Sequence, residues 1–362
     1  MMEETGMKLE KEKKNVLKSS WVTYGMVILV YVLVEIALKT GHMSSLMEGL
    51  LVPLCTYSIL AVSLNLVVGI SGELSLGHAG FMCVGAFSGA LFSKVFKGSL
   101  DPTVSLVIAI FIGAAAAAVF GILIGIPVLR LRGDYLAIVT LAFGEIIKNI
   151  INAIYLGVDS SGLHFSMKSE VALNLDAEGT VLIKGAQGIT GTPLASTFTI
   201  GVILLLITLV ISINLIHSRT GRAIMAIRDN RIAAESIGLN ITKYKLLAFT
   251  VSAALAGVAG VLYAHNLTTL AALPKNFGYN QSIMILVFVV LGGIGNVRGS
   301  VIAAVVLTLL PELLRGLNNY RMLIYAIVLI AIMLFNSSPK SIEFRERAAQ
   351  AFRKKTVKKE AA

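Results

Sequence analysis

The sequence predicts an all-α integral membrane protein with about ten transmembrane helices, some of them broken or glycine-rich. Hydrophobic residues make up 56% of the 362 residues and charged residues only 14%, and the mean hydropathy is +0.83. Soluble domains carry about 25% charged residues, so a soluble fold could not bury this much apolar surface. Apolar segments that approach the roughly 20 residues needed for a span recur along the whole chain.

Ten apolar segments are the candidate spans. The third is glycine-rich and the eighth is short, so these two are the weakest. No small-residue cleavage site follows the first segment, so we expect a retained span rather than a signal peptide. Cys55 and Cys83 both fall in apolar segments and form no disulfide framework. The segments are 21–38, 47–70, 74–96, 103–129, 135–156, 197–216, 246–264, 281–292, 299–314 and 322–335.

The basic residues predict the orientation, because Lys and Arg accumulate in cytoplasmic loops. If the N-terminus is cytoplasmic and all ten segments cross, 22 of the 31 Lys and Arg lie inside and eight outside, with Lys148 in a span. Both termini are therefore expected in the cytoplasm, as basic tails over 1–20 and 337–362 around a permease domain over 21–336. This bias and attraction of the tails to anionic lipid account for most of the net charge of +11, and no nucleic-acid role is expected.

Two longer polar segments interrupt the apolar pattern. The 158–193 segment is expected outside and is too long for an idle connector. The 217–245 segment, hereafter the 217–245 loop, is expected inside. Glycines cluster over 69–89 and 292–299, next to the two weakest spans. Paired glycine-interrupted segments predict broken helices and an internal repeat.

The SLGHAGF motif at 75–81 gives the third segment a face almost without side chains. Gly77 and Gly80, with further glycines at 85 and 89, would let helix backbones approach closely. The same glycines would permit unwinding beside a cavity, and both interpretations stay open. His78 is expected near the cytoplasmic end, and a hydrogen-bonded packing residue is favoured there over a ligand. All three are candidates for the transport pathway or a subunit interface.

Glu145 and Lys148 place two charges in the fifth segment. Glu145 lies about 15 Å in from Tyr135 along a helix, near the midplane, where a charge costs roughly 2.5–3.5 kcal/mol. The two residues are three apart, so they share a helix face and can form a pair. They are either a polar feature of the pathway or interface, or a pair that only neutralises itself; the second interpretation is slightly favoured.

The stretch GRAIMAIRDNRIAAESIG at 221–238 is the main candidate contact with a soluble partner. Asp229 or Asn230 can cap a helix, and Gly238 suits its termination. A short helix of small residues in a basic loop is what a channel needs to dock onto a soluble motor; the alternative is a surface helix lying at the interface. The candidate residues are Gly221, Arg228, Asp229, Arg231, Ala233, Ala234, Glu235 and Gly238.

The sequence contains no motif for nucleotide binding, zinc binding or nucleophilic catalysis. It lacks G-x-x-x-x-G-K-[ST], so it does not bind ATP through a P-loop. Its five histidines are scattered, and no zinc or nucleophile constellation is present. We therefore expect a non-enzymatic protein without a metal or cofactor of its own.

With these motifs in view, the chain resembles the permease subunits of branched-chain amino acid ABC importers, of the LivM type. The resemblance covers roughly 50–335. In importer permeases the docking loop carries Glu-Ala-Ala, three residues and then Gly; here Ala233, Ala234 and Gly238 match, and Ile232 stands in place of the Glu. The matching stretches are GELSLGHAGF at 72–81, LRLRGDYLAIVTLAFGEI at 129–146, GAQGITGTP at 185–193, TGRAIMAIRDNRIAAESIGLNITKYKLLAF at 220–249 and LGGIGNVRGSVIAA at 291–304.

The resemblance implies one half of a channel in a bacterial or archaeal cytoplasmic membrane. Its partners would be a homologous permease subunit, two ATPase subunits that bind and hydrolyse ATP, and an extracytoplasmic substrate-binding protein. Related permeases carry urea or simple sugars, and these remain alternatives. The main rival class is an autonomous secondary transporter, which would need titratable groups along its path, and only Glu145 lies near the midplane. A membrane scaffold is a further rival.

Overall fold

The computed structural model describes residues 2–41, 43–131, 133–160, 162–176 and 179–337. The chain forms two compact units, Met1–Val305 and Val306–Ala362. Residues 338–362 of the predicted C-terminal tail, which was placed over 337–362, lie outside the described residues. Helix α12 (Val297–Leu313) begins in the first unit and ends in the second. The second unit continues with the 3₁₀ segment η4 (Leu314–Tyr320) and helix α13 (Arg321–Ser337).

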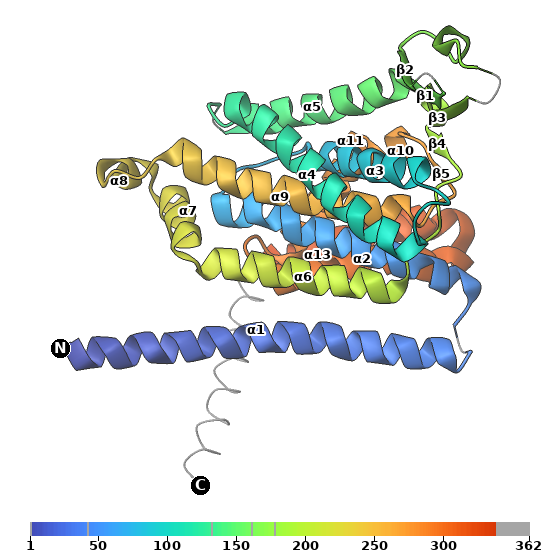
Figure 1. Ribbon diagram of the computed structural model, residues 1–362. Helices are drawn as coiled ribbons and strands as arrows, with labels where there is room; N and C mark the ends of the chain where they lie inside the picture. Colours follow the sequence, from blue (N-terminus) through green and yellow to red (C-terminus); the bar gives the residue numbers. More distant parts are fainter. Residues whose placement is uncertain (1, 42, 132, 161, 177–178, 338–362) are drawn as a thin grey trace. The chain divides into compact units, whose positions relative to one another are not determined.

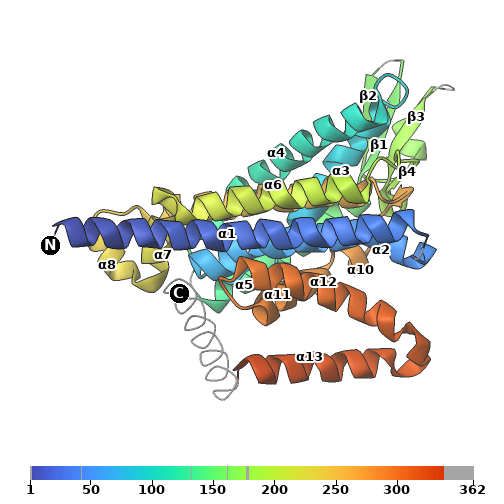
Figure 2. The ribbon, with the colours of Figure 1, turned by 90° about the horizontal axis from the view of Figure 1, so that it is seen from below.

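Long helices build the first unit (Figures 1 and 2). They are α1 (Met2–Lys39), α2 (Ser45–Asn65), α3 (His78–Val95), α4 (Pro102–Val128), α5 (Asp134–Ala153), α6 (Phe198–His217) and α9 (Ile241–Ala264), with the shorter α7 (Arg219–Asp229), α8 (Arg231–Ser236), α10 (Pro274–Phe277) and α11 (Tyr279–Gly292). A π-helical turn, η1 (Leu66–Ser71), extends α2.

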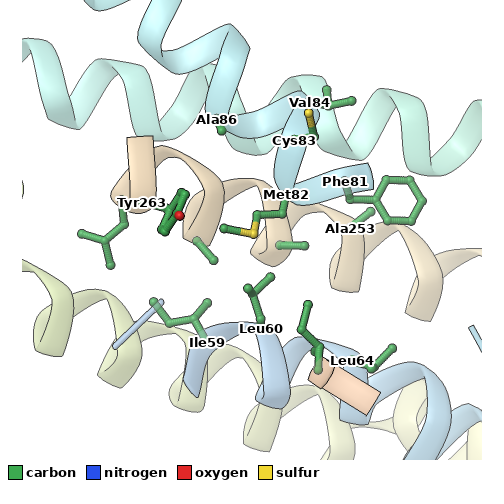
Figure 3. Packing of buried hydrophobic residues seen from close by; sticks show 14 of the residues in the cluster. Ile59, Leu60, Leu64, Phe81, Met82, Cys83, Val84, Ala86, Ala253 and Tyr263 are labelled. Atoms are coloured by element: carbon green, nitrogen blue, oxygen red, sulfur yellow. The ribbon is translucent and has the colours of Figure 1, made fainter. Parts of the chain in front are cut away.

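Helix α2 is the centre of the first unit. The most apolar part of α2 and its π-helical extension is 83% buried, whereas the most apolar part of α1 is 11% buried. Figure 3 shows Leu60 and Leu64 of α2 pointing toward Met82 of α3 and the side chains of α9. Since α2 is apolar all round and enclosed by other helices, it fits the rule that such helices are buried.

Glycines bring α3, α4 and α9 into close contact. A Cβ added at Gly85 would lie 2.3 Å from the Cα of Gly257, and one at Gly257 would lie 2.5 Å from the carbonyl oxygen of Gly113. Any larger residue there would force the helices apart. The close approach predicted from the glycine face of the third segment is therefore confirmed.

Two small antiparallel sheets add strands to the predicted all-α fold. The first has the order β2-β1-β3, and the second pairs β4 with β5. Most of the strands lie in the 158–193 segment, which was predicted only as a polar segment too long for an idle connector. Its backbone groups bond to each other within these sheets. The strands are β1 (Tyr155–Asp159), β2 (Gly162–Ser166), β3 (Thr180–Lys184), β4 (Ile189–Thr190) and β5 (Thr269–Leu270).

The sheets and the 217–245 loop lie at opposite ends of the first unit (Figure 1). We call these the sheet end and the α8 end. The beginning of α1 lies at the α8 end in both views.

Among the described residues, seven helices are long and apolar enough to cross a membrane: Trp21–Lys39, Ser45–Ser71, Pro102–Val128, Asp134–Ala153, Phe198–His217, Ile241–Ala264 and Val297–Gly316. They coincide with seven of the ten predicted segments. The other three correspond to α3, α11 and α13, with 18, 14 and 17 residues. Crossing by all ten segments, and their orientation, stay predictions.

The third predicted span begins with non-helical residues, as its glycines indicated, whereas the eighth is the short continuous helix α11, followed by the non-helical residues 293–296. Residues 72–77 are not helical, and α3 begins only at His78. Helix α11 begins beside it, since the Ala79 N–H donates to Ser282 Oγ at 3.1 Å. The two helices then diverge. Lys94 near the end of α3 donates to the Val181 carbonyl of β3, and Gly295 after α11 donates to Asn65 near the end of α2.

Candidate functional site

The 217–245 loop folds as two short helices. The Ser218 hydroxyl caps α7 by accepting from the Gly221 N–H at 3.0 Å. Gly221 lies so close to the end of α6 that a Cβ would meet the Leu215 carbonyl oxygen at 2.1 Å. The chain therefore turns sharply from α6 into α7, which fixes where the rest of the loop projects.

Helix α8 has the ends that the sequence predicts. The Asn230 side chain accepts from the Ala233 N–H at 3.0 Å and caps the start. Gly238 follows with φ +85°, and the Leu239 N–H donates back to the Ala234 carbonyl at 3.1 Å. A left-handed residue stabilised by such a bond is a common helix terminator.

The exposed face of α8 differs from the expected one. Ala234 is only 2% exposed and packs on Ile227 and Ile241. It therefore holds α8 against α7 and α9, which corrects its expected place beside a partner. Ile232 and Ile237 are instead 81% and 75% exposed. The surface of α8 available for docking consists of these two isoleucines together with exposed Ala233 and Glu235.

Arg228 joins the loop to the end of α2. Its Nη1 donates to the Gly69 carbonyl at 2.8 Å, while Nε and Nη2 donate to Asp229 at 3.0 and 2.8 Å. Arg231 is half-buried on the first turn of α8. Arg228 and Asp229 therefore act inside the chain, besides any contact they make with a partner.

Glu145 and Lys148 form the predicted ion pair on α5. The Lys148 side chain is 7% exposed and that of Glu145 is 25% exposed. The other Glu145 oxygen accepts from the Tyr279 N–H at 2.7 Å. Because Tyr279 begins α11, the carboxylate also caps the positive end of that helix. The pair thus does more than neutralise itself: it joins α5 to the start of α11.

His78 is a buried packing residue, as favoured. Its Nε2 lies 2.7 Å from Ser63 Oγ, and it is buried at the start of α3. Ser63 lies eight residues before the end of η1 at Ser71, about 12 Å along the helix. His78 is therefore inside the unit rather than near its end, because the non-helical 72–77 segment carries the chain inward before α3 begins.

Gly77 and Gly80 both pack on α5. A Cβ at Gly77 would lie 2.3 Å from the Thr140 carbonyl oxygen, and one at Gly80 would lie 2.7 Å from the Gly144 Cα. The two glycines set the distance between α3 and α5. Together with Glu145, Lys148 and His78 they form one cluster, which we call the polar junction, where α3, α5 and α11 meet.

Sequence reasoning missed the residues that link these two sites. Glu73 forms an ion pair with Lys245, and Ser282 bonds the start of α3. Asn65 donates to Ser300 and accepts from Gly295. Glu73 and Lys245 are 172 residues apart along the chain, and Asn65 and Ser300 are 235 residues apart, so no local pattern could reveal these pairs. The described residues hold no group of three or more His, Cys, Asp or Glu that could bind a metal ion.

Residues 46–333 match the family described as branched-chain amino acid transport system permease component. The high-affinity branched-chain amino acid transport system permease protein LivM of Salmonella typhimurium is 36% identical over 294 residues, which cover 77% of this chain and 66% of that protein. LivM of Escherichia coli shows the same identity and coverage. The fructose import permease protein FruG of Bifidobacterium longum is 26% identical over 318 residues, 85% of each chain.

The chain thus spans slightly less than two thirds of the two LivM proteins. No solved structure matches it at a significant level. The family match covers most of the first unit, including the 217–245 loop and the polar junction. In the part of the chain that the structure describes, seven helices are long and apolar enough to cross a membrane. This multi-pass membrane protein belongs to the family of branched-chain amino acid transport system permease components.

Proposed function

We propose that the chain is the transmembrane permease subunit of an ATP-driven importer that moves branched-chain amino acids into the cytoplasm. The observation that carries this proposal is the 36% identity to LivM over 294 residues. The protein would lie in a bacterial or archaeal cytoplasmic membrane with both termini inside. It would pair with a homologous permease and hold no cofactor, since the partner ATPases would bind and hydrolyse ATP.

The α8 end is the proposed contact with the ATPase subunits. Ile232 and Ile237 are large apolar residues that the chain itself leaves uncovered. Helix α8 is capped at both ends and packed from behind through Ala234, so it presents them on a fixed support. Such rigid apolar anchors favour a protein partner, because little side-chain freedom is lost on binding.

The sheet end is the proposed contact with the substrate-binding protein. Strand β2 lies at the edge of its sheet, and Leu163 and Phe165 are exposed on the same face because alternate residues of a strand share a face. Val171 is exposed nearby in the chain. Lys94 donates to two carbonyls of β3 and ties the sheet to the end of α3.

The second permease subunit is proposed to cover the polar junction. Glu145 is a quarter exposed in the middle of α5, and Asn149 and Asn280 are exposed close to it in the chain and at the start of α11. Polar groups facing lipid at this depth are costly. A protein or water-lined neighbour on this face removes that cost.

The similarity to FruG supports a sugar permease as the second candidate. In the importer scheme the binding protein selects the solute, so this chain alone does not fix the substrate. An autonomous secondary transporter remains the rival from another class, and it predicts transport without ATP.

The proposal is tested with the tagged chain purified from its native membrane. We expect two ATPase subunits, a second permease and a binding protein to co-purify, with leucine, isoleucine or valine bound to the binding protein. In proteoliposomes these amino acids should enter only when ATP is present on the α8 side. Uptake of fructose instead would support the sugar permease, and uptake driven by an ion gradient without ATP would overturn the proposal.

A further inference from the structure

Two side chains of the 217–245 loop hold one short stretch at the end of α2. Arg228 donates to the Gly69 carbonyl at 2.8 Å. Its aliphatic stem also covers Gly72, where an added Cβ would lie 2.6 Å from Arg228 Cγ. Gly72 has φ +73° and ends the π-helical turn. Arg228 therefore contacts the chain where the π-helical turn after α2 stops and the non-helical 72–77 segment starts.

The second connection is the ion pair between Lys245 and Glu73. Their side chains are only 11% and 14% exposed. The Glu73 N–H also donates to the Val67 carbonyl at 3.1 Å, so the backbone of this residue is fixed as well. Lys245 is the last residue of the 217–245 loop and lies in the first turns of α9. Helix α7, which precedes α8 in the chain, thus contacts Gly72, and helix α9, which follows α8, contacts the next residue, Glu73.

The other end of this segment is attached to the polar junction. The Leu76 N–H donates to Thr140 Oγ1 of α5 at 3.0 Å, and Gly77 packs directly on the Thr140 carbonyl. Two residues further, Ala79 is bonded to Ser282 of α11. The 72–77 segment is therefore held by contacts at both of its ends, and the contacts of the 217–245 loop and those of the polar junction fall within its six residues.

We propose that Arg228, Lys245 and Glu73 are positioning residues that transmit movement of the 217–245 loop through the 72–77 segment to the polar junction. A shift of α8 displaces α7 and α9. Through Arg228 and Lys245, this displacement reaches the start of the 72–77 segment. The start of α3 then shifts against Thr140 and Ser282. The inference rests on the proposed function, because it needs an ATPase that moves α8, and it names the route by which that movement reaches the spans.

The test measures solute transported per ATP hydrolysed, in proteoliposomes containing the whole complex. The variants are Glu73→Gln, Lys245→Met and their combination, together with Arg228→Met, which keeps an aliphatic stem over Gly72 but removes the hydrogen bonds. We expect the ATPase subunits to stay bound while uptake per ATP falls about five-fold or more in each single variant. The double variant should lose no more than the worse single variant, because both act through one ion pair.

Lys243→Met is the matched control, since Lys243 is exposed two residues earlier on α9 and loses the same charge. Its uptake per ATP should equal that of the wild type. Wild-type uptake per ATP in both Glu73→Gln and Arg228→Met would contradict the proposed route. A fall in the double variant equal to the product of the two single falls would contradict it as well. Failure of the proposed function is a different result: the wild-type complex itself would hold no ATPase or show no ATP-dependent uptake.

Discussion

At the residue scale, the two charged residues in the middle of α5 each have a specific partner. Lys148 is nearly buried on α5 and is paired with Glu145, whose second oxygen bonds the start of α11. A buried pair of this kind adds little stability by itself, but removing one partner leaves a charge uncompensated. The position of the pair between α5 and α11 therefore matters more than its net energy.

Glu145→Leu should harm the protein more than the double substitution Glu145→Leu/Lys148→Leu. The single change strands the Lys148 ammonium in a buried site, at a cost of about 3 kcal/mol or more, while the double change leaves no charge behind. Detergent-solubilised yield and thermal melting of the complex measure the difference. Equal, wild-type behaviour of both variants would show that neither residue matters.

Gly238→Ala should loosen the 217–245 loop. Gly238 has φ +85°, and this conformation costs a residue with a Cβ roughly 1–2 kcal/mol. The opened population of the loop then rises by roughly 5- to 30-fold, and limited proteolysis of the loop accelerates accordingly.

Gly49→Ala serves as its control, because Gly49 lies in α2 with an ordinary φ and open space around it. The 217–245 loop of Gly49→Ala should be cleaved at the wild-type rate. Equal cleavage rates of the loop in Gly238→Ala and the wild type would contradict the strain argument.

At the element scale, α8 has two faces with different roles. Ala234 faces α7 and α9, and Ile232 and Ile237 face outward. Ala234→Trp would therefore disrupt the support of α8 before it tested any docking contact. Substitutions on the outer face separate the two effects.

The combined substitution Ile232→Asp/Ile237→Ser should weaken the ATPase contact without unfolding the loop. Central apolar anchors contribute about 2 kcal/mol or more to an interface, so the affinity should fall by about ten-fold or more. Titration of the ATPase subunits onto the reconstituted permease measures it.

Leu163→Asp on β2 is the reciprocal variant at the sheet end. It should keep the ATPase affinity and reduce stimulation of ATP hydrolysis by the binding protein. If both variants weaken the same partner, the assignment of the two ends is wrong.

At the scale of the whole molecule, the helices separate two differently built ends (Figure 1). The α8 end carries the short helices α7 and α8, and the sheet end carries the two small sheets. The excess of Lys and Arg predicts which end faces the cytoplasm. Orientation is therefore the property on which the proposed partners at both ends depend.

Cysteines introduced at Glu235 and Ala172, both exposed, test this orientation. An impermeant thiol reagent added to intact cells should label Ala172→Cys only, and Glu235→Cys should react only after the cells are opened. The native Cys55 and Cys83 are buried and give little background. Labelling of Glu235→Cys from outside would reverse the topology and exchange the proposed partners of the two ends.

Local patterns in the sequence predicted most of the helices and the ends of α8. The caps at Asn230 and Gly238 and the pair on α5 depend on residues at most five apart, which a helix and its end bring together by their own geometry. The burial of Ala234 could not be predicted in this way, because Ile227 and Ile241 meet it only after three helices have packed. The strands of the 158–193 segment were missed because each has only two to five residues, and one of them pairs with a distant part of the chain, as Ile189 does with Leu270.

The sequence by itself determined that this is a mostly helical membrane protein, with about ten apolar segments predicted, a glycine-rich third segment and a capped α8, since each follows from composition or short-range spacing. The tertiary structure alone decided that α3 and α11 begin beside each other at the polar junction, and that Glu73, Arg228 and Lys245 connect this place to the 217–245 loop. The physical reason is that hydrogen bonds and ion pairs between residues far apart in the chain form only where packing sets their positions. Helix packing in turn depends on which glycines face each other, as Gly85 and Gly257 do.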